Sequence, residues 1–375
     1  MTLQNLRQAS TAFYIGGFEA IGGIEACFQD LCLALVGQPL DRALFAWADD
    51  LPQLRAIAAS GTAVHRVALR SGCRWALPDW ALYLAHGGKL SAVDRIVFGK
   101  IPPKAIFLKM LAMLDRRLDD RPELLYITAY RPAEMWPDGL PDYARASIDT
   151  MVVQSPDFTA DLRAMGFSGR IVEVPYLPPP AAKPSQPLPP GDRTCRFGFL
   201  GRFVAQKNLF YLLDIVEALV GEQIELHMFG EGELDERLRA DVVARGLPVI
   251  FHGAVPRDKV PASIDSCDIF LNPSVSEGQC LVALEVLSRG RPFLASGVGA
   301  IPQILSRGRF GAILPLDDAA AAAAAIRGVS SEWRSGGWAP ADVAQSYAAA
   351  YRRDAILARY VDLFTGREAA FELAS

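Results

Sequence analysis

The sequence predicts an α/β protein built from two domains. The chain has 375 residues, more than one hydrophobic core usually covers, and this length suits two domains of about 150 to 190 residues. The segment PYLPPPAAKPSQPLPP at 175–190 has eight prolines in sixteen residues, so it can form neither a helix nor a central strand. After this segment, strand-like apolar runs alternate with helical patterns of roughly 10 to 15 residues, which is typical of a doubly wound parallel sheet.

The N-terminal half begins with an apolar run, a glycine-rich loop and a helical pattern. The loop contains Gly22 and Gly23, and glycine allows the backbone of such a turn to come close to a ligand. The rest of this half is less regular but also indicates α/β structure. The predicted elements are a strand at 12–15, a helix at 24–35 and strands at 124–128, 151–154 and 171–174.

The C-terminal half shows the alternation most clearly. Asn208 stands before apolar positions at helical spacing and is a candidate helix cap. Asp317 and Asp318 precede a run of alanines and suit the start of a helix. The predicted strands are 196–200, 224–229, 249–252, 269–271, 292–295 and 312–314, and the predicted helices are 209–220, 233–245, 279–289 and one from 319.

These patterns divide the chain into four parts. We expect an N-terminal Rossmann-like domain at 1–178, a proline-rich linker at 179–192, a C-terminal Rossmann-like domain at 193–340, and helices at 341–375 that cross back to the first domain. Open α/β sheets bind ligands beyond the carboxyl ends of their strands. Candidate functional residues are therefore sought in the loops that follow the predicted strands.

The composition excludes several classes of function. A net charge of -4 and a pI near 5.7 give no basic face for nucleic acid. The six cysteines form no CxxC pair and the four histidines no HExxH motif, so we expect no structural zinc. The most apolar stretch, 105–114, contains Lys109 and is too short to span a bilayer. The N-terminus lacks a signal-peptide pattern, and we expect a cytoplasmic protein.

The segment SVSEGQCLVALEVLSRGRP at 274–292 carries the clearest chemical pattern. Glu277 and Gly278 lie in the loop after a predicted strand, and a helix follows at once. The first amides of that helix have no intrahelical partner and favour an anion such as phosphate. Glu285 comes eight residues after Glu277, a rise of about 12 Å along a helix. The two carboxylates could therefore reach the two ends of an extended nucleotide sugar.

Three further features follow predicted strands. Arg202 and Lys207 come after the strand that ends at Gly201, and two cations beside a helix N-terminus could neutralise a diphosphate. Gly230 and Gly232 follow the next strand. Taken singly, each feature has an ordinary explanation: glutamates flanking a helix, solvated surface cations, or a plain βα turn.

In this order, the segments resemble the large retaining glycosyltransferase family 4. The resemblance is dense over about 195–316 and looser at AIGGIEAC (20–27) and in the stretch from 152 to 176. It implies a GT-B fold, in which two Rossmann-like domains face each other across a cleft. The segments that carry it most clearly are FGFLGRFVAQKN (197–208), LHMFGEGELDERL (226–238), FHGAVPRDKVPASIDSCDIFLNPSVSEG (251–278) and GRPFLASGVGAIPQIL (290–305).

The resemblance also implies a function. It implies transfer of a hexose-type sugar, with retention and without a metal or other cofactor, from a UDP- or GDP-sugar to a glycan or lipid-linked acceptor, as in polysaccharide biosynthesis. The second domain would hold the donor and the first domain the acceptor. Carried over residue by residue, the catalytic group is Glu277, Lys207 and Arg202, and the donor-binding group is Gly22, Gly23, Gly201, Gly230, Gly232, Gly278, Gln279, Cys280, Leu281 and Glu285.

The sequence departs from the family at two places. Many members carry a histidine after a first-domain strand, where LLYITAYRPAEMW at 124–136 offers Tyr130 and Arg131 instead. The usual EGFG reads EGQC, so Gln279 and Cys280 change the side chains beside the sugar. Two alternatives stay open: a GT-B sugar-nucleotide epimerase, or a weakly active or inactive nucleotide-sugar-binding protein.

One stretch indicates a membrane surface. Residues 100–121 combine apolar residues with five or more cations, a pattern that suits peripheral contact with the anionic inner face of a membrane. The alternative is a core helix with its cations in solvent.

Overall fold

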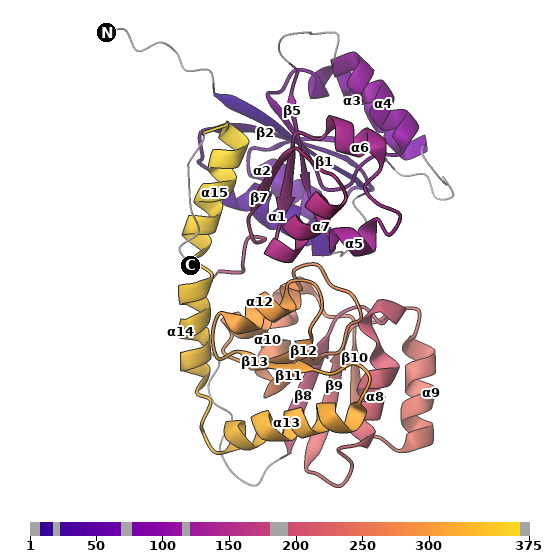
Figure 1. Ribbon diagram of the computed structural model, residues 1–375, viewed down its shortest axis with the longest axis vertical. Coiled ribbons are helices and arrows are strands. Elements are labelled where there is room, and N and C mark those ends of the chain that lie inside the picture. The colour runs from indigo at the N-terminus through magenta and orange to yellow at the C-terminus, as the bar shows by residue number, and fades with distance from the viewer. Residues whose placement is uncertain (1–7, 18–22, 69–76, 115–120, 181–193, 368–375) are drawn as a thin grey trace. The chain divides into compact units, whose positions relative to one another are not determined.

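The computed structural model describes residues 8–17, 23–68, 77–114, 121–180 and 194–367 (Figure 1). Gly22 and most of the predicted linker at 179–192 lie outside these residues. The chain forms two compact units. The first unit comprises 1–177 and 354–375, and the second comprises 178–353.

The first unit contains a seven-stranded parallel sheet in the order β3-β2-β1-β4-β5-β6-β7. Strand β1 has β2 on one side and β4 on the other, so the strand order reverses at β1. The strands are β1 (Ala9–Gly17), β2 (Leu40–Trp47), β3 (Ala63–Val67), β4 (Arg95–Phe98), β5 (Glu123–Ile127), β6 (Thr150–Val153) and β7 (Arg170–Glu173).

Helices cover both faces of this first sheet, because right-handed crossovers to its two sides place helices on opposite faces. The core on the α3 and α4 face is rich in aromatic residues, among them Phe98, Phe107 and Phe158. The helices are α1 (Gly23–Ala34), α2 (Pro52–Ala59), α3 (Leu77–Leu90), α4 (Lys104–Leu114), α5 (Pro132–Met135), α6 (Asp142–Ser147) and α7 (Pro156–Ala164).

The end of the chain completes the first unit. In α15 (Arg353–Thr365), the Phe364 ring lies 5.2 Å from the Phe13 ring, and the Phe364 carbonyl accepts a hydrogen bond from Thr11 Oγ1 at 3.0 Å. Helix α14 (Pro340–Ala350) instead belongs to the second unit. The terminal segment predicted at 341–375 is thus divided between the two units.

The second unit contains a six-stranded parallel sheet in the order β10-β9-β8-β11-β12-β13. Its strand order reverses at β8, which pairs with β9 and β11. Every strand predicted for this half forms within one residue of its expected bounds. The strands are β8 (Cys195–Leu200), β9 (Ile224–Phe229), β10 (Val249–Gly253), β11 (Ile269–Asn272), β12 (Phe293–Ser296) and β13 (Gly311–Leu314).

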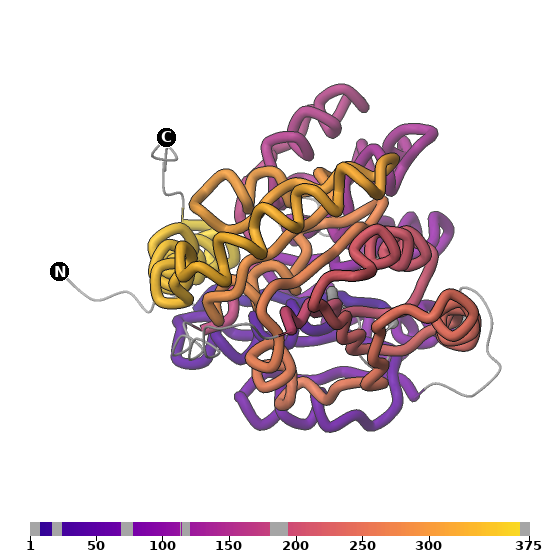
Figure 2. The backbone as a smooth tube through the Cα atoms, turned by 90° about the horizontal axis from the view of Figure 1, so that it is seen from below, coloured from indigo at the N-terminus to yellow at the C-terminus, as the bar shows by residue number. Residues whose placement is uncertain are grey.

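The helices of this unit also lie on both faces of its sheet. Helix α13 packs beside α8 on one face (Figure 2). Asp318 caps α13 as expected, because its Oδ1 accepts a hydrogen bond from the Ala321 amide. The helical segments are η1 (Ala205–Lys207), α8 (Leu209–Glu217), α9 (Asp235–Arg245), η2 (Arg257–Lys259), α10 (Val260–Asp265), α11 (Leu281–Ser288), α12 (Ile301–Ser306) and α13 (Ala319–Arg334).

The prediction that Asn208 caps the helix after it was wrong. Asn208 does stand before α8, but its side chain makes no capping hydrogen bond. Its backbone is left-handed, with φ of 52°, a conformation that asparagine tolerates better than most residues. Asn208 therefore turns the chain between η1 and α8 rather than capping the helix.

Candidate functional site

The predicted donor residues of the second unit lie where its sheet reverses strand order. Strand β8 ends just before Gly201, and its neighbour β11 ends at Asn272. The loop after β8 leads to Lys207, and the loop after β11 leads to Glu277. Adjacent parallel strands deliver both loops to the same edge, at the switch point where doubly wound sheets bind ligands.

Lys207 and Glu277 form an ion pair at this edge. Lys207 Nζ lies 2.6 Å from Glu277 Oε1, and the two side chains are 19% and 8% exposed. The same oxygen accepts hydrogen bonds from Ser274 Oγ at 2.7 Å and from Asn272 Nδ2 at 3.0 Å. Three donors thus hold a nearly buried carboxylate in one orientation through a single oxygen.

Hydrogen bonds hold the two loops together. The Gln206 carbonyl accepts a hydrogen bond from the Val275 amide at 2.9 Å, and Gln206 Nε2 donates to the Ser276 carbonyl at 2.7 Å. A Cβ on Gly299 would lie 2.2 Å from the Glu277 carbonyl oxygen. Only glycine fits behind this loop, and the position of Glu277 is therefore fixed from both sides.

Helix α11 begins two residues later than predicted. Its first residue is Leu281, and Cys280 precedes it with φ of 57° in the left-handed region. Gln279 and Cys280 are both buried, and Cys280 Sγ accepts a hydrogen bond from Asn272 Nδ2 at 3.2 Å. Burial raises the pKa of the Cys280 thiol to about 12. The amides of Gln279 and Cys280 therefore belong to the loop, and those from Leu281 onward to the helix.

Glu285 lies on α11, and its carboxylate is 3.8 Å from the Arg257 guanidinium. Its side chain is 21% exposed, so it is neither a core residue nor a fully solvated one. Arg202 is exposed and forms no ion pair with any residue that the structure describes. Its guanidinium therefore differs from the Lys207 ammonium, which already has a carboxylate partner.

Close packing between the turns after β8 and β9 explains why glycines stand there, and the sequence pattern did not show this. A Cβ on Gly230 would lie 1.9 Å from the Gly201 carbonyl oxygen, and one on Gly232 would lie 2.5 Å from the Phe203 carbonyl oxygen. Glycine allows backbone to approach backbone at both positions, and their role in donor binding stays a prediction. These contacts pack the turn after β9 against the loop that begins at Gly201.

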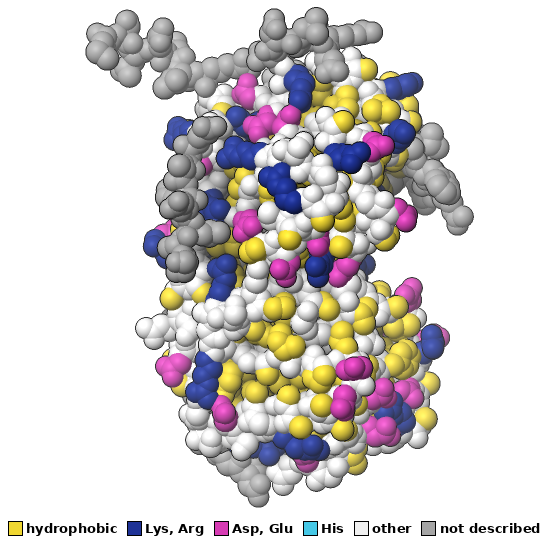
Figure 3. Space-filling model, viewed as in Figure 1, with side chains coloured by type: hydrophobic (Ala, Val, Ile, Leu, Met, Phe, Trp, Pro, Cys, Tyr) yellow, Lys and Arg dark blue, Asp and Glu magenta, His cyan; other side chains and the backbone are white. Residues whose placement is uncertain are grey.

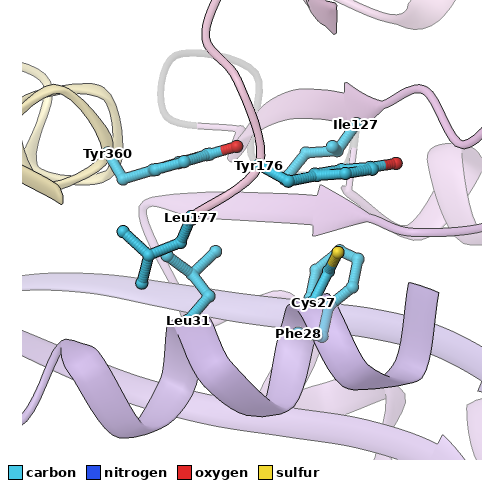
Figure 4. Close-up of a pocket in the computed structure, with 7 residues that line it drawn as sticks. All are labelled: Cys27, Phe28, Leu31, Ile127, Tyr176, Leu177 and Tyr360. Carbon is cyan, nitrogen blue, oxygen red and sulfur yellow. The ribbon is translucent and has the colours of Figure 1, made fainter. Parts of the chain in front are cut away.

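The predicted first-unit glycines are only partly described. Gly23 is the first residue of α1, whereas Gly22 lies outside the described residues. Farther along α1, Cys27 and Phe28 line a small apolar pocket with Tyr176 (Figure 4). The Tyr176 hydroxyl donates to the Thr128 carbonyl at 2.6 Å. With this hydroxyl engaged and a mainly apolar lining, the pocket offers little to a diphosphate.

Two contacts at the site were not singled out from the sequence. Asn272 and Ser274 both donate to Glu277, and Ser274 Oγ also contacts Asn272 Oδ1. Their position in the sequence could have indicated them, since each lies at or just after the carboxyl end of β11.

Charged side chains of both signs are interspersed on the face shown in Figure 3. Over the described residues, no cluster of three or more His, Cys, Asp or Glu side chains is arranged to hold a metal ion. Among those same residues, no helix is both long and apolar enough to cross a bilayer.

Comparison with known proteins finds matches over the second unit. Residues 194–332 match the family model described as "Glycosyl transferases group 1". An uncharacterized 41.2 kDa protein in the cps region of Klebsiella pneumoniae is 29% identical over 123 residues, 32% of this chain and 33% of that protein. The sulfoquinovosyl transferase SQD2 of Arabidopsis thaliana is 32% identical over 106 residues, 28% of this chain and 20% of that protein. These matches span a third or less of either relative.

A solved structure extends the likeness to both units. The Anabaena protein HepE, in complex with UDP-glucose, has a TM-score of 0.72 and 15% sequence identity, covering 95% of this chain and 99% of HepE. This likeness confirms the predicted fold class, with two Rossmann-like units as in GT-B proteins. Residues 194–332 thus match the group 1 glycosyl transferases, whereas over both units together the likeness is one of fold.

Proposed function

We propose that this protein is a retaining glycosyltransferase that takes a hexose-type sugar from a nucleotide diphosphate without a metal ion. The observation that carries this proposal is the Lys207–Glu277 pair at the switch point of the second sheet. A carboxylate held by three donors is organised before any ligand arrives. Groups organised in advance and aimed at developing charge are a major source of catalysis.

The proposed roles follow from the position of each group. All three donors reach Oε1 of Glu277, and Oε2 is the oxygen that we assign to a hydroxyl of the transferred sugar. Arg202 and Lys207 would bind the diphosphate. The ammonium of Lys207 has three donors and can serve both Glu277 and a phosphate. The amides of Gly278 to Leu281 would face the diphosphate or sugar, and Glu285 would hold the ribose.

Metal independence follows from the same charges. The bond from the anomeric carbon to the diphosphate oxygen breaks, and negative charge grows on the leaving group. The cations of Arg202 and Lys207 and the start of α11 would stabilise that charge. For retention, an oxygen of the leaving diphosphate accepts the proton of the acceptor hydroxyl, which attacks the same face of the sugar.

The donor and acceptor are proposed more broadly. HepE was solved with UDP-glucose, which favours a UDP-sugar over a GDP-sugar as the first donor to test.

A glycan or lipid-linked acceptor would place the protein in the cytoplasm, with peripheral contact at the membrane's inner face. Within the stretch 100–121, Leu108 on α4 is 42% exposed and Lys104 and Lys109 are exposed. Co-sedimentation with anionic but not zwitterionic liposomes would support this contact, and equal binding to both would reject it.

A donor screen followed by a transfer assay tests the function. A nucleotide sugar at a hundred times its dissociation constant should stabilise the protein by about 2.7 kcal/mol, which a thermal shift with EDTA present detects. The stabilising donor is then incubated with candidate glycans. Acceptor-dependent transfer with an unchanged anomeric configuration is the expected result. Epimerisation of the donor, or tight binding without turnover, would overturn the proposal.

A further inference from the structure

Asn272 engages its whole carboxamide group at the donor site. Its Nδ2 donates hydrogen bonds to Glu277 Oε1 at 3.0 Å and to Cys280 Sγ at 3.2 Å. A primary amide has two N–H hydrogens, one for each of these acceptors. Its Oδ1 faces the Ser274 hydroxyl. Asn272 is only 5% exposed, so solvent does not readily replace any of these partners.

Cys280 has a backbone conformation that favours glycine. Its φ is 57° and its ψ is 75°, in the left-handed region that a residue with a Cβ enters at a cost. Among the described residues, Asn208 is the one other non-glycine residue with positive φ. Such conformations persist where surrounding contacts hold them, and they gather at functional sites. The sequence EGQC therefore places a side chain where EGFG has none, and that side chain needs an explanation.

The Cys280 side chain lies inside the site. The residue is 7% exposed, and its sulfur is the acceptor for Asn272. Burial raises the pKa of the thiol most, the Glu277 carboxylate raises it further, and the Lys207 ammonium lowers it. Both members of the ion pair thus act on this sulfur, which stays protonated and uncharged at neutral pH. Cys280 Sγ is a neutral acceptor beside the pair.

Loss of this sulfur would act on Glu277 through Asn272. One N–H of the buried amide would have no acceptor, which is costly for a group that solvent does not reach. Rotation of the amide would relieve that cost, but it would also turn the other N–H away from Glu277 Oε1. The carboxylate would then lose one of its three donors and, with it, its single orientation.

We propose that Cys280 is a positioning residue for Glu277 and that it acts through Asn272. Cys280 Sγ fixes the amide of Asn272, the amide fixes Glu277 Oε1, and Oε2 thereby keeps its direction toward a hydroxyl of the transferred sugar. This inference deepens the proposed transferase function and rests on it. The Cys280 side chain itself contacts no substrate.

The test compares a nucleotide sugar with its parent diphosphate, because the proposed contact of Glu277 is with the sugar. Calorimetric titrations of the full chain with UDP-glucose and with UDP give the ratio of the two affinities, and GDP-mannose with GDP is the second pair. Cys280→Ala removes the acceptor and should lower the ratio at least about fivefold, roughly the contribution of one hydrogen bond. Cys280→Ser keeps an acceptor and should restore most of the ratio. A general structural loss would weaken the sugar nucleotide and the diphosphate alike.

Further variants separate the hydrogen bond from backbone strain. Cys280→Gly also removes Sγ, but glycine suits the left-handed backbone, so this variant keeps the fold and should lower the ratio as Cys280→Ala does. Asn272→Ala should lower the ratio at least as much. Adding Cys280→Ala to it should change the ratio less than about twofold more, because both act through one contact. Cys267→Ala is the matched control, a fully buried cysteine before the amino end of β11, and should leave the ratio unchanged.

Glu277→Gln distinguishes this inference from the function on which it rests. An unchanged ratio in Glu277→Gln would mean that the sugar contact assigned to Glu277 is wrong, and the role of Cys280 would fall with it. A lowered ratio in Glu277→Gln with a wild-type ratio in Cys280→Ala and Cys280→Gly would overturn the positioning role alone. Failure of Cys280→Ser to recover the ratio would overturn it as well.

Discussion

Lys207 and Glu277 are separated by 70 positions in the sequence, yet Lys207 Nζ lies 2.6 Å from Glu277 Oε1. Adjacent strands β8 and β11 bring the two loops to one sheet edge. The pair is shielded, with Glu277 only 8% exposed at its side chain, and hydrogen bonds from Asn272 and Ser274 complete its environment.

Removing either member of the pair should impair catalysis. Lys207→Ala and Glu277→Ala should each lower turnover at least about a hundredfold, the scale of losing one preorganised electrostatic group. Initial rates with the donor found by thermal shift measure the effect. Lys259→Ala is the control, since that side chain is 70% exposed, and its rate should match the wild type. Near wild-type rates in both site variants would reject the assigned roles.

The pair should also show energetic coupling. Lys207→Met leaves the Glu277 carboxylate buried without its cation, and we expect a loss of about 2 kcal/mol or more in the free energy of unfolding. Adding Glu277→Gln should recover part of this loss, with a coupling energy of about 1–3 kcal/mol. Urea unfolding measures all three variants. Arg55→Met breaks an exposed pair with Asp50 and should cost about 0.5 kcal/mol or less. Strictly additive losses would contradict a coupled pair.

Gly230 should not tolerate a side chain. Gly230→Ala places a Cβ 1.9 Å from the Gly201 carbonyl oxygen, which forces the two loops apart. Gly221→Ala is the control, because Gly221 also has positive φ but would meet nothing within 4 Å. The control should lose about 1 kcal/mol from backbone strain alone. Gly230→Ala should lose at least about 2 kcal/mol more. Equal thermal stability of the two variants would refute the steric explanation.

The stability of the protein should fall in mild acid. Burial and the neighbouring His227 lower the pKa of His252, and burial and Lys89 lower that of His65. The unfolded chain then binds more protons than the folded protein, so stability is complete above the ordinary histidine pKa near 6.5 and declines as pH falls below it. Urea midpoints between pH 7.5 and 5.5 should show the decline. His252→Gln should flatten it, and an unchanged slope would contradict this assignment.

Cys280 should be unreactive in the folded protein. Its pKa is raised to about 12 by burial, so little thiolate exists at pH 8. Iodoacetamide followed by mass spectrometry should find Cys280 unmodified in native protein and labelled after denaturation. Native labelling at the rate of a free thiol would mean that the loop before α11 opens readily.

The sequence indicated the second unit better than the first for physical reasons. Strands such as 269–271 and 292–295 are apolar throughout, whereas β2 contains Asp41 and Arg42. The edge strand β3 carries His65 and Arg66, which hides its pattern. The carboxyl-edge rule pointed to Lys207 and Glu277. It could not show that they pair with each other, because a contact between distant loops depends on strand order.

The central claim is that the Lys207–Glu277 site binds a sugar-nucleotide diphosphate without a metal. Calorimetric titration with UDP-glucose, and with GDP-mannose as the second donor, tests it most directly when EDTA is present. We expect one of them to bind the wild type, Lys207→Ala to weaken that binding at least about tenfold, and Lys259→Ala to leave it unchanged. Binding that appears only after Mg²⁺ is added, or that is equal in Lys207→Ala and the wild type, would contradict the account.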